Sequence, residues 1–236
     1  MAITNKGFSN QWENAYKSGR HLSIFPWTDL VILVNKFAHP SIFKKKTPKV
    51  LEIGCGAGAN ISFLKNIGFE YYGIDGSDTA INQCRKRFPD IKNNLITGDF
   101  SESFKFEEKF DLIVDRASLT HNKTLTIKNI IFLIENCLTG KGKYIGVTLF
   151  STEHPQFLKG IPISDDEYTK TEYLQGPFNE IGNVHFFNLD QIKSLFLNFS
   201  IEHLEHIEKK TIIGNIEDTT VYWNLVASKF FYENNK

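Results

Sequence analysis

Between residues 49 and 150 the sequence alternates short apolar runs with segments of helical periodicity, and this alternation is the strongest constraint on the fold. The apolar runs predict strands at residues 49–55, 71–76, 94–100, 110–117 and 143–150. The segments between them predict helices at residues 60–67, 77–88 and 126–138. Strands joined by helices are normally parallel and covered on both faces. The sequence therefore predicts an α/β fold with a doubly wound sheet.

The end of the chain follows a different pattern. Residues 188–199 have helical periodicity, with Gln191 placed for a capping box. Two further apolar runs, 199–209 and 219–230, have no helix between them. A link this short favours an antiparallel hairpin. We therefore expect seven strands, of which the last is antiparallel.

Two segments lie outside the alternation. Residues 8–40 include an amphipathic helix, and residues 151–187 are rich in Pro, Gly and aromatic residues. A loop as long as the second is functional or disordered in most compact domains. We interpret the chain as one domain, 1–236, with an N-terminal helical cover (1–48), a core (49–150), an inserted segment (151–187) and a C-terminal helix with a hairpin (188–236). The inserted segment is either a lid, walled by Phe157, Tyr168, Tyr173 and Phe178, or a poorly ordered surface loop.

Charge and composition exclude several classes of partner. The chain has 27 Lys plus Arg against 27 Asp plus Glu, which gives no electrostatic reason to expect nucleic acid or an anionic membrane. No apolar run reaches the roughly 18 residues that a membrane span needs. The three cysteines are too far apart to predict a disulfide framework or a metal knuckle. Because residues 1–10 also lack the apolar run of a secretory signal, we expect a cytoplasmic protein.

The most specific motif is the glycine-rich turn after the first predicted strand, Leu51 to Asn60. Ligands of doubly wound sheets bind at the carboxyl ends of the strands. Gly54, Gly56 and Ala59 also fit the dinucleotide fingerprint G-x-G-x-x-A, so the turn alone leaves a nicotinamide dehydrogenase open. Glu52, just before the turn, favours a cationic ligand over a pyrophosphate.

Two more acidic residues end the next two predicted strands. Asp75 is placed to accept hydrogen bonds from both hydroxyls of a ribose, as it would be in a dinucleotide enzyme too. Gly98-Asp99-Phe100 ends the third strand, where Asp99 can accept from an adenine amino group and Phe100 can cover the ring.

With these residues the chain resembles the class I S-adenosylmethionine-dependent methyltransferases. Their motif E/D-x-G-x-G-x-G matches Glu52 to Gly58, and their strand-two acid and strand-three G-D pair match Asp75 and Gly98-Asp99. The run Phe110 to Arg116 matches their fourth strand. Trp12-Glu13-Asn14-Ala15-Tyr16 is similar to the W-E-x-x-Y element of small-molecule members, which covers the cofactor.

The resemblance implies S-adenosylmethionine as cofactor, S-adenosylhomocysteine as product, and a role for each motif. The glycine turn would face the methionine part, the strand-two end the ribose and the strand-three end the adenine, while a backbone carbonyl after strand four would receive the amino group. The residues assigned in this way are Trp12, Tyr16, Glu52, Gly54, Cys55, Gly56, Gly58, Asp75, Gly76, Ser77, Asp99, Phe100, Asp115 and Arg116.

Two residues after the fourth strand are candidates for catalysis. His121 lies beside the expected methyl group, and an ordinary imidazole pKa suits a general base at neutral pH. The alternative is a loop histidine that caps the next helix or packs on its neighbours. Arg116 would pair with an anionic substrate, or else with Asp111 or Asp115. His154 and His185 with the acidic run 165–167 match no metal-ligand spacing, so we predict no metal.

We therefore expect methyl transfer to a small polar metabolite, more readily on oxygen than nitrogen, such as a sugar or a phosphorylated or carboxylated intermediate. The alternatives are an N-methyltransferase, a methyltransferase of protein or RNA, and a cofactor-binding subunit without catalysis. The macromolecular alternative has little support, because the segment after strand four is Asp115-Arg116-Ala117-Ser118 and not an N-P-P-Y-type tetrapeptide.

Overall fold

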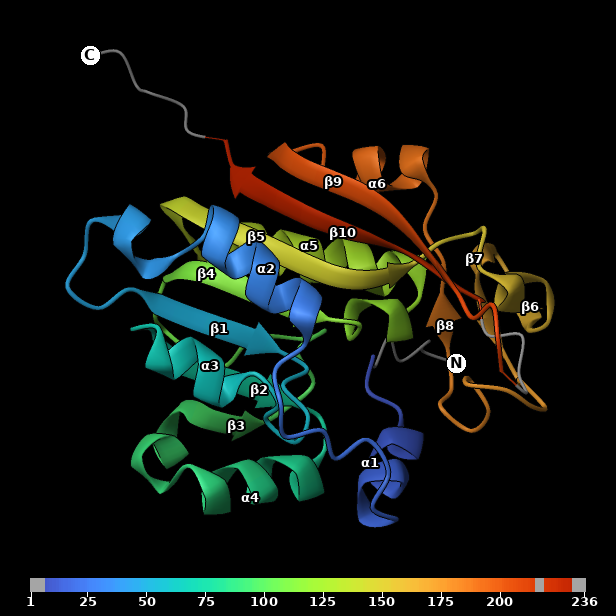
Figure 1. The fold of residues 1–236 in the computed structure, drawn as a ribbon, viewed down its shortest axis with the longest axis horizontal. Coiled ribbons are helices and arrows are strands. Elements are labelled where there is room, and N and C mark those ends of the chain that lie inside the picture. The colour runs from blue at the N-terminus through green and yellow to red at the C-terminus, as the bar shows by residue number, and fades with distance from the viewer. Residues whose placement is uncertain (1–6, 215–218, 231–236) are drawn as a thin grey trace.

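The computed structural model describes residues 7–214 and 219–230, and its centre is a seven-stranded sheet (Figure 1). The strand order is β3-β2-β1-β4-β5-β10-β9. The first five strands are parallel where they pair, and β10 runs antiparallel to both β5 and β9. The doubly wound fold with an antiparallel last strand is confirmed. The strands are β1 Lys49–Ile53, β2 Glu70–Asp75, β3 Leu95–Thr97, β4 Phe110–Arg116, β5 Leu138–Phe150, β9 Phe199–Lys210 and β10 Thr219–Lys229.

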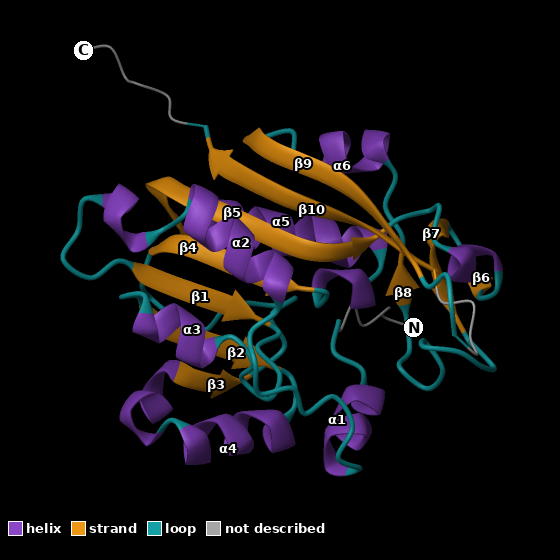
Figure 2. Ribbon diagram, in the orientation of Figure 1, coloured by secondary structure: helices purple, strands orange, loops and turns teal. Residues whose placement is uncertain are grey.

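Helices cover both faces of this sheet (Figure 2). Successive residues of a strand point to opposite faces. Accordingly, Val50 packs into the core beneath α2 and α3, whereas Leu51 and Ile53 pack into the core beneath α5 and α6. The sheet is therefore buried on both sides, as expected for parallel strands. The helices are α1 Asn10–Lys17, α2 Thr28–Phe37, α3 Ile61–Asn66, α4 Asp78–Arg87, α5 Thr124–Cys137 and α6 Leu189–Leu195.

The inserted segment 151–187 is structured. It contains a small antiparallel sheet of three strands, β6 Ile161–Ile163, β7 Asp166–Thr171 and β8 Val184–His185, packed near the carboxyl ends of the parallel strands (Figure 1). The Phe187 amide donates to the Phe150 carbonyl at 2.7 Å, which ties the segment to the end of β5. The segment thus has regular secondary structure, and its role as a lid stays a prediction. The described residues also form four 3₁₀ turns, η1 Pro40–Phe43, η2 Pro89–Asn94, η3 Leu119–His121 and η4 Pro155–Leu158.

The predicted start of α5 is wrong by two residues, for a reason that lies far away in the sequence. The helix begins at Thr124, and its N-cap residue Lys123 offers no side-chain cap. Instead, Asp166 on β7 accepts from the Thr124 amide at 2.7 Å and from its hydroxyl at 2.8 Å. A carboxylate at a helix N-terminus satisfies free N–H groups and the helix dipole. The inserted segment thus caps a core helix.

Other element ends differ in smaller ways. β5 begins at Leu138, five residues before the predicted start, because it follows α5 without a turn. Asn188 caps α6 through the Gln191 amide at 2.8 Å, but the Gln191 side chain contacts His185 Nε2 at 3.1 Å instead of closing the capping box. Ser77 is the N-cap of α4, because its hydroxyl accepts from the Ala80 amide. The outermost residues of the predicted cover and tail, 1–6 and 231–236, lie outside the described residues.

The sequence predicts no membrane-spanning segment, and the helices of the structure bear on this prediction. Within residues 7–214 and 219–230, no helix combines the length and the apolar character that crossing a bilayer requires.

The buried face of α5 gives a test of the packing. Ile130 is fully buried in the core between α5 and the sheet, so Ile130→Ala should lower the free energy of unfolding by about 2–4 kcal/mol. Phe132 lies on the same helix but is 59% exposed, so Phe132→Ala should change it by less than about 1 kcal/mol. Urea denaturation of both variants checks the assignment, and equal losses would contradict it.

Candidate active site

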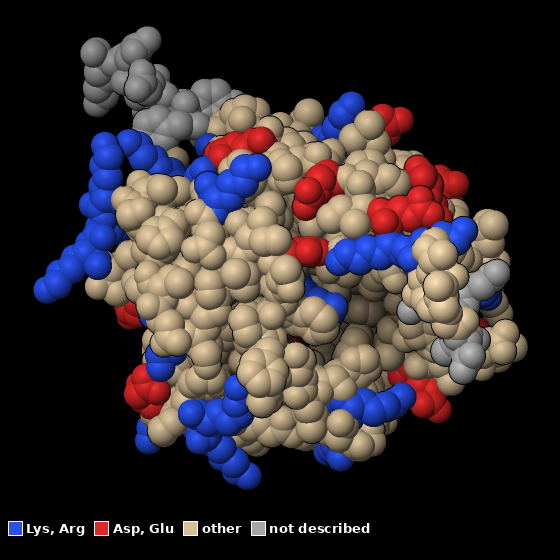
Figure 3. All heavy atoms as spheres, viewed as in Figure 1, with Lys and Arg blue, Asp and Glu red and all other residues tan. Residues whose placement is uncertain are grey.

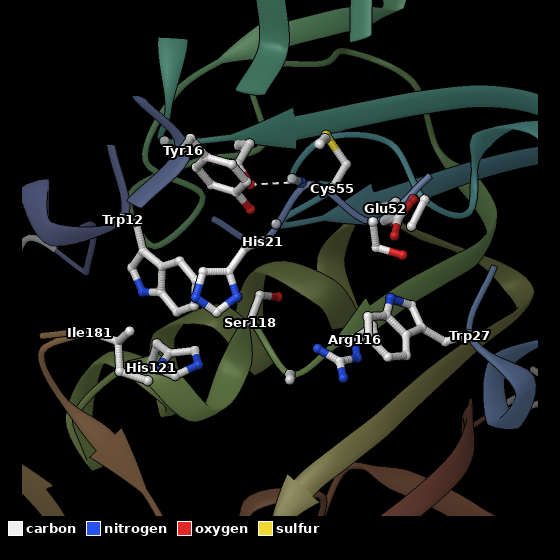
Figure 4. A pocket seen from close by; sticks show the side chains of 18 of the residues that line it. Trp12, Tyr16, His21, Trp27, Glu52, Cys55, Arg116, Ser118, His121 and Ile181 are labelled. Carbon is white, nitrogen blue, oxygen red and sulfur yellow. Dashed lines mark hydrogen bonds between the residues drawn. The ribbon is translucent and has the colours of Figure 1, made fainter. Parts of the chain in front are cut away.

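A cavity of about 410 Å³ lies at the carboxyl ends of the parallel strands. Its walls come from the turn after β1, the end of β2 and the loop after β4, and α1, the segment 21–27 and the inserted segment border its outer side. Figure 3 shows the surface hollowed on this face, and Figure 4 shows the side chains inside. Eleven of the predicted site residues line the cavity: Trp12, Tyr16, Glu52, Gly54, Cys55, Gly56, Asp75, Gly76, Phe100, Arg116 and His121.

The turn after β1 can be built only with glycine. Gly54 and Gly56 have φ of +66° and +52°, in the left-handed region that side chains disfavour. A Cβ on Gly54 would lie 2.3 Å from the Ser118 Cβ, and one on Gly56 would lie 2.5 Å from the Tyr16 hydroxyl. The turn is therefore pressed between the loop after β4 and the cover helix α1, and its backbone faces the cavity.

Three buried carboxylates surround this turn. Glu52 accepts from the side-chain amide Nδ2 of Asn60 at 2.7 Å and from the Tyr71 hydroxyl at 2.6 Å. Asp75 accepts from the amides of Gly56 and Ser77, both at 2.8 Å. Burial raises the pKa of Glu52 to about 7 and that of Asp75 to about 6, because a charged carboxylate loses its hydration. Such a wall favours a cation and disfavours a pyrophosphate, which argues against the dinucleotide alternative.

The third carboxylate, Asp115, lies behind the wall and holds the loop after β4. It accepts from the Ser118 amide at 2.8 Å and from the Leu119 amide at 3.2 Å. Burial raises its pKa to about 6. Its side chain thus positions the loop that carries Ser118 and His121 and does not itself line the cavity.

Three more predicted residues support the site from outside the cavity wall. Asp99 accepts from the Phe8 amide at 3.0 Å and from the Ser101 amide at 2.9 Å, so it anchors the N-terminal segment. Gly58 packs against Ile61 and Cys84, where a Cβ would be too close. Ser77 caps α4. Their predicted contacts with cofactor stay predictions.

The cover helix α1 is held to the core by one carboxylate. Glu13 accepts from the hydroxyls of Ser77 and Thr79, the latter at 2.7 Å, at the N-terminus of α4. Burial opposes the charge, yet the hydrogen bonds from Ser77 and Thr79 lower the Glu13 pKa to about 2. Glu13 therefore stays ionised at neutral pH and keeps Trp12 and Tyr16 over the cavity.

His121 is fixed in one tautomer. Its Nδ1 lies 3.0 Å from the Asn183 carbonyl oxygen. A carbonyl can only accept, so Nδ1 carries the proton and Nε2 keeps a free lone pair. Burial lowers the pKa of His121 to about 4, against the Asn183 hydrogen bond and helped by the nearby Arg116 charge. The ring is therefore neutral at pH 7, a hydrogen-bond acceptor but a weak base.

Arg116 has neither of the carboxylate partners that the sequence offered. Asp111 pairs with Lys45 Nζ at 2.6 Å, and Asp115 is used by the loop amides. Within the described chain, no carboxylate lies within 4.0 Å of the Arg116 guanidinium, and its buried Nε has no hydrogen-bond partner. Its Cζ lies 3.5 Å from the centroid of the Trp27 ring. The cavity therefore presents a cation ready for an anionic group.

Comparison with known proteins identifies the domain. Residues 50–142 match the family model described as "Methyltransferase domain". Three proteins of Schizosaccharomyces pombe, each named an uncharacterized methyltransferase, are 32% identical over 68 residues, 28% of this chain. Within residues 50–142 the chain is therefore similar to a methyltransferase domain, and the activity of the whole protein is a proposal. The matched segment spans about half the length of those curated relatives (47%).

Solved structures agree with this methyltransferase fold. A methyltransferase from Anabaena variabilis superimposes with a TM-score of 0.66 at 14% identity, covering 98% of this chain and 96% of that one. A methyltransferase from Methanosarcina mazei gives a TM-score of 0.61 at 20% identity, and the alignment covers 82% of this chain and 98% of that one. The 1,6-didemethyltoxoflavin-N1-methyltransferase of Burkholderia thailandensis gives a TM-score of 0.62 at 15% identity, and the alignment covers 92% of this chain and 84% of that one.

The cavity has further lining residues besides the predicted cofactor and catalytic residues. Most come from the segments outside the strand–helix alternation, whose position over the sheet leaves no periodic signal. Of the four residues expected to wall the inserted segment, Phe178 lines the cavity, whereas Phe157, Tyr168 and Tyr173 do not. Phe150 and Ala117 could have been found from their places at strand ends. The further lining residues are Phe8, His21, Ser23, Trp27, Ala57, Ala59, Asn60, Ala117, Ser118, Phe150, Pro177, Phe178 and Ile181. No group of three or more His, Cys, Asp or Glu side chains in residues 7–214 and 219–230 is arranged to hold a metal ion.

The raised pKa of Glu52 predicts a pH dependence of the stability of the methyltransferase domain. The folded state keeps the Glu52 proton up to about pH 7, whereas the unfolded chain releases it near pH 4.5, so stability falls as pH rises through this window. Urea denaturation at pH 5 and pH 8 should show wild type losing roughly 3 kcal/mol more than Glu52→Gln. Glu107→Gln, at an exposed site, is the control. Parallel losses in wild type and Glu52→Gln would show that Glu52 does not titrate in this range.

Proposed function

We propose that the protein transfers the methyl group of S-adenosylmethionine to a small-molecule acceptor. The observation that carries this proposal is the glycine turn with Glu52 and Asp75 buried beside it, because a sulfonium donor is cationic whereas a dinucleotide brings a pyrophosphate. When bound, the donor supplies a methyl group already activated for displacement. The chain then has to orient the two reactants and exclude water.

The residues of the cavity fit this donor. Each oxygen of Asp75 accepts one amide hydrogen bond and keeps room for a second, so the carboxylate can still receive two ribose hydroxyls. Gly54 and Gly56 line the cavity, so the backbone of the turn can lie along the methionine part. Phe100 lies in the wall, where it can cover the adenine.

The cover favours a small acceptor over a macromolecule. α1 and the inserted segment both border the outer side of the cavity, so a small acceptor fits between them and the strand ends more readily than a macromolecule does. The Burkholderia thailandensis neighbour, which acts on the small molecule 1,6-didemethyltoxoflavin, supports the same conclusion. An acceptor with an anionic group is favoured by Arg116, and a protein or RNA substrate has no comparable support. A cytoplasmic location stays a prediction.

The atom that is methylated is constrained by His121. With a pKa of about 4, His121 accepts a hydrogen bond through Nε2 but does not remove a proton from a simple alcohol efficiently. We therefore favour an acceptor atom that is already ionised or has a free lone pair at neutral pH, and the preference for oxygen over nitrogen stays a prediction.

Titration with S-adenosylhomocysteine tests the donor. Calorimetry should give saturable binding to wild type, and Asp75→Asn should weaken it at least tenfold because hydrogen bonds to a charged acceptor are lost. Asp78→Asn, an exposed change three residues away, should leave the affinity within twofold. Tight NADH binding with no response to S-adenosylhomocysteine would replace this proposal by the dehydrogenase alternative. Donor binding without turnover of any acceptor would support the non-catalytic subunit.

Turnover by His121→Ala tests the role of the imidazole. With donor saturating and the acceptor that gives the highest rate, we expect kcat to fall about tenfold while the affinity for S-adenosylhomocysteine changes less than twofold. Because His121 is neutral throughout, its ionisation should add no limb to the wild-type profile of kcat between pH 6 and 8. A limb near pH 6.5 that disappears in His121→Ala would instead identify an ordinary general base.

A further inference from the structure

One side of the cavity is walled almost entirely by rings. Trp12 meets His121 edge-on at 4.7 Å between centroids, and Phe150 meets Phe178 at 4.8 Å. Ile181 completes this wall, and Phe150, Phe178 and Ile181 are themselves at least nine-tenths buried. Figure 4 shows Trp12, His121 and Ile181 grouped together, with Arg116 and Trp27 across the cavity from them.

This ring wall has little to offer to a polar ligand. Its polar groups are His121 Nε2, because the Nδ1 proton is used by Asn183, and the indole N–H of Trp12. The two carboxylates that line the cavity, Glu52 and Asp75, belong to the glycine turn and have their own hydrogen bonds. A sugar placed against the ring wall would leave several hydroxyls without partners, and each buried unpaired hydroxyl is costly.

A flat aromatic ligand matches the same wall. Rings that pack edge-to-face or offset against aromatic neighbours gain attraction beyond the burial of area. Phe178 and Phe150 present such neighbours, and contacts outside the cavity fix their positions. The ring centroid of Phe178 lies 5.4 Å from that of Tyr173 and 6.0 Å from that of Phe186. The ring centroid of Phe150 lies 6.1 Å from that of Phe186. The wall is thus pre-formed, which lowers the cost of binding a rigid ring.

The opposite side supplies the charge. Arg116 is mostly buried, its guanidinium stacks on Trp27, and its Nε has no hydrogen-bond partner in the described chain. An acidic group is the natural partner of a guanidinium in such a site. We propose that the methyl acceptor is a small aromatic acid, with its ring against the ring wall and its anionic group at Arg116. This inference rests on the proposed function, and within it selects an aromatic acceptor over a sugar.

Binding of matched probes tests the inference without requiring turnover. Benzoate, cyclohexanecarboxylate and glucose 6-phosphate are titrated into protein saturated with S-adenosylhomocysteine, and tryptophan fluorescence is followed because Trp12 and Trp27 line the cavity. The two carboxylates share charge and size and differ in aromaticity. We expect benzoate to bind at least fivefold more tightly than cyclohexanecarboxylate, and glucose 6-phosphate to bind more weakly than both.

Variants separate the contribution of the ring from that of the charge. Phe178→Leu should remove most of the preference for benzoate over cyclohexanecarboxylate and leave binding of the latter within twofold. Arg116→Met should weaken both carboxylates at least tenfold and keep their ratio. Leu174→Ala is the matched control on the inserted segment, because Leu174 is 93% exposed and does not line the cavity.

The outcomes distinguish this inference from the proposed function. Failure of S-adenosylhomocysteine to bind in calorimetry overturns the proposed function. Normal binding of S-adenosylhomocysteine overturns only the aromatic acceptor if benzoate does not bind, if the two carboxylates bind equally, or if glucose 6-phosphate binds most tightly. The expected order of probes, lost in Phe178→Leu and kept in Leu174→Ala, supports it.

Discussion

The site depends on the close approach of two loops at the carboxyl ends of neighbouring strands. The Ser118 hydroxyl donates to the Ile53 carbonyl at 2.9 Å, and a side chain at Gly54 would collide with Ser118. Asp115 holds this arrangement by accepting from the Ser118 and Leu119 amides. Because β1 and β4 are adjacent and parallel, these contacts join the glycine turn to the segment that carries Arg116 and His121. The cofactor wall and the acceptor wall are therefore one rigid unit.

This unit contains buried carboxylates that do not help the protein to fold. Glu52, Asp75 and Asp115 are buried with their pKa raised, and no salt bridge to any of them is found among the described residues. Buried carboxylates without a cation reduce stability, although amide and hydroxyl donors offset part of the loss. A cationic ligand would recover that free energy. The same electrostatic arrangement thus costs stability in the free protein and favours a sulfonium donor over its neutral thioether product.

Sequence reasoning was accurate where the chemistry is local. The strand–turn–helix pattern identified the sheet, and it brought Glu52 and Asp75 to one cavity, where their contacts with a cofactor stay predictions. It was less informative where distant segments meet. Asp99 is at its predicted strand end but accepts from the Phe8 amide, and α5 begins where Asp166 caps it. The pKa of His121 was also out of reach, because it depends on burial that no spacing reveals.

The N-terminal cover shows why these distant contacts matter for the chemistry. Glu13 joins α1 to the N-terminus of α4, and Asp99 joins the preceding segment to the end of β3. Both contacts use carboxylates, and both are made to groups beside the expected nucleoside part of the donor. Tyr16, carried by α1, reaches the glycine turn itself. The cover is therefore attached to the strand ends that, under the proposed function, would hold the donor, and there it would shield the reacting groups from water.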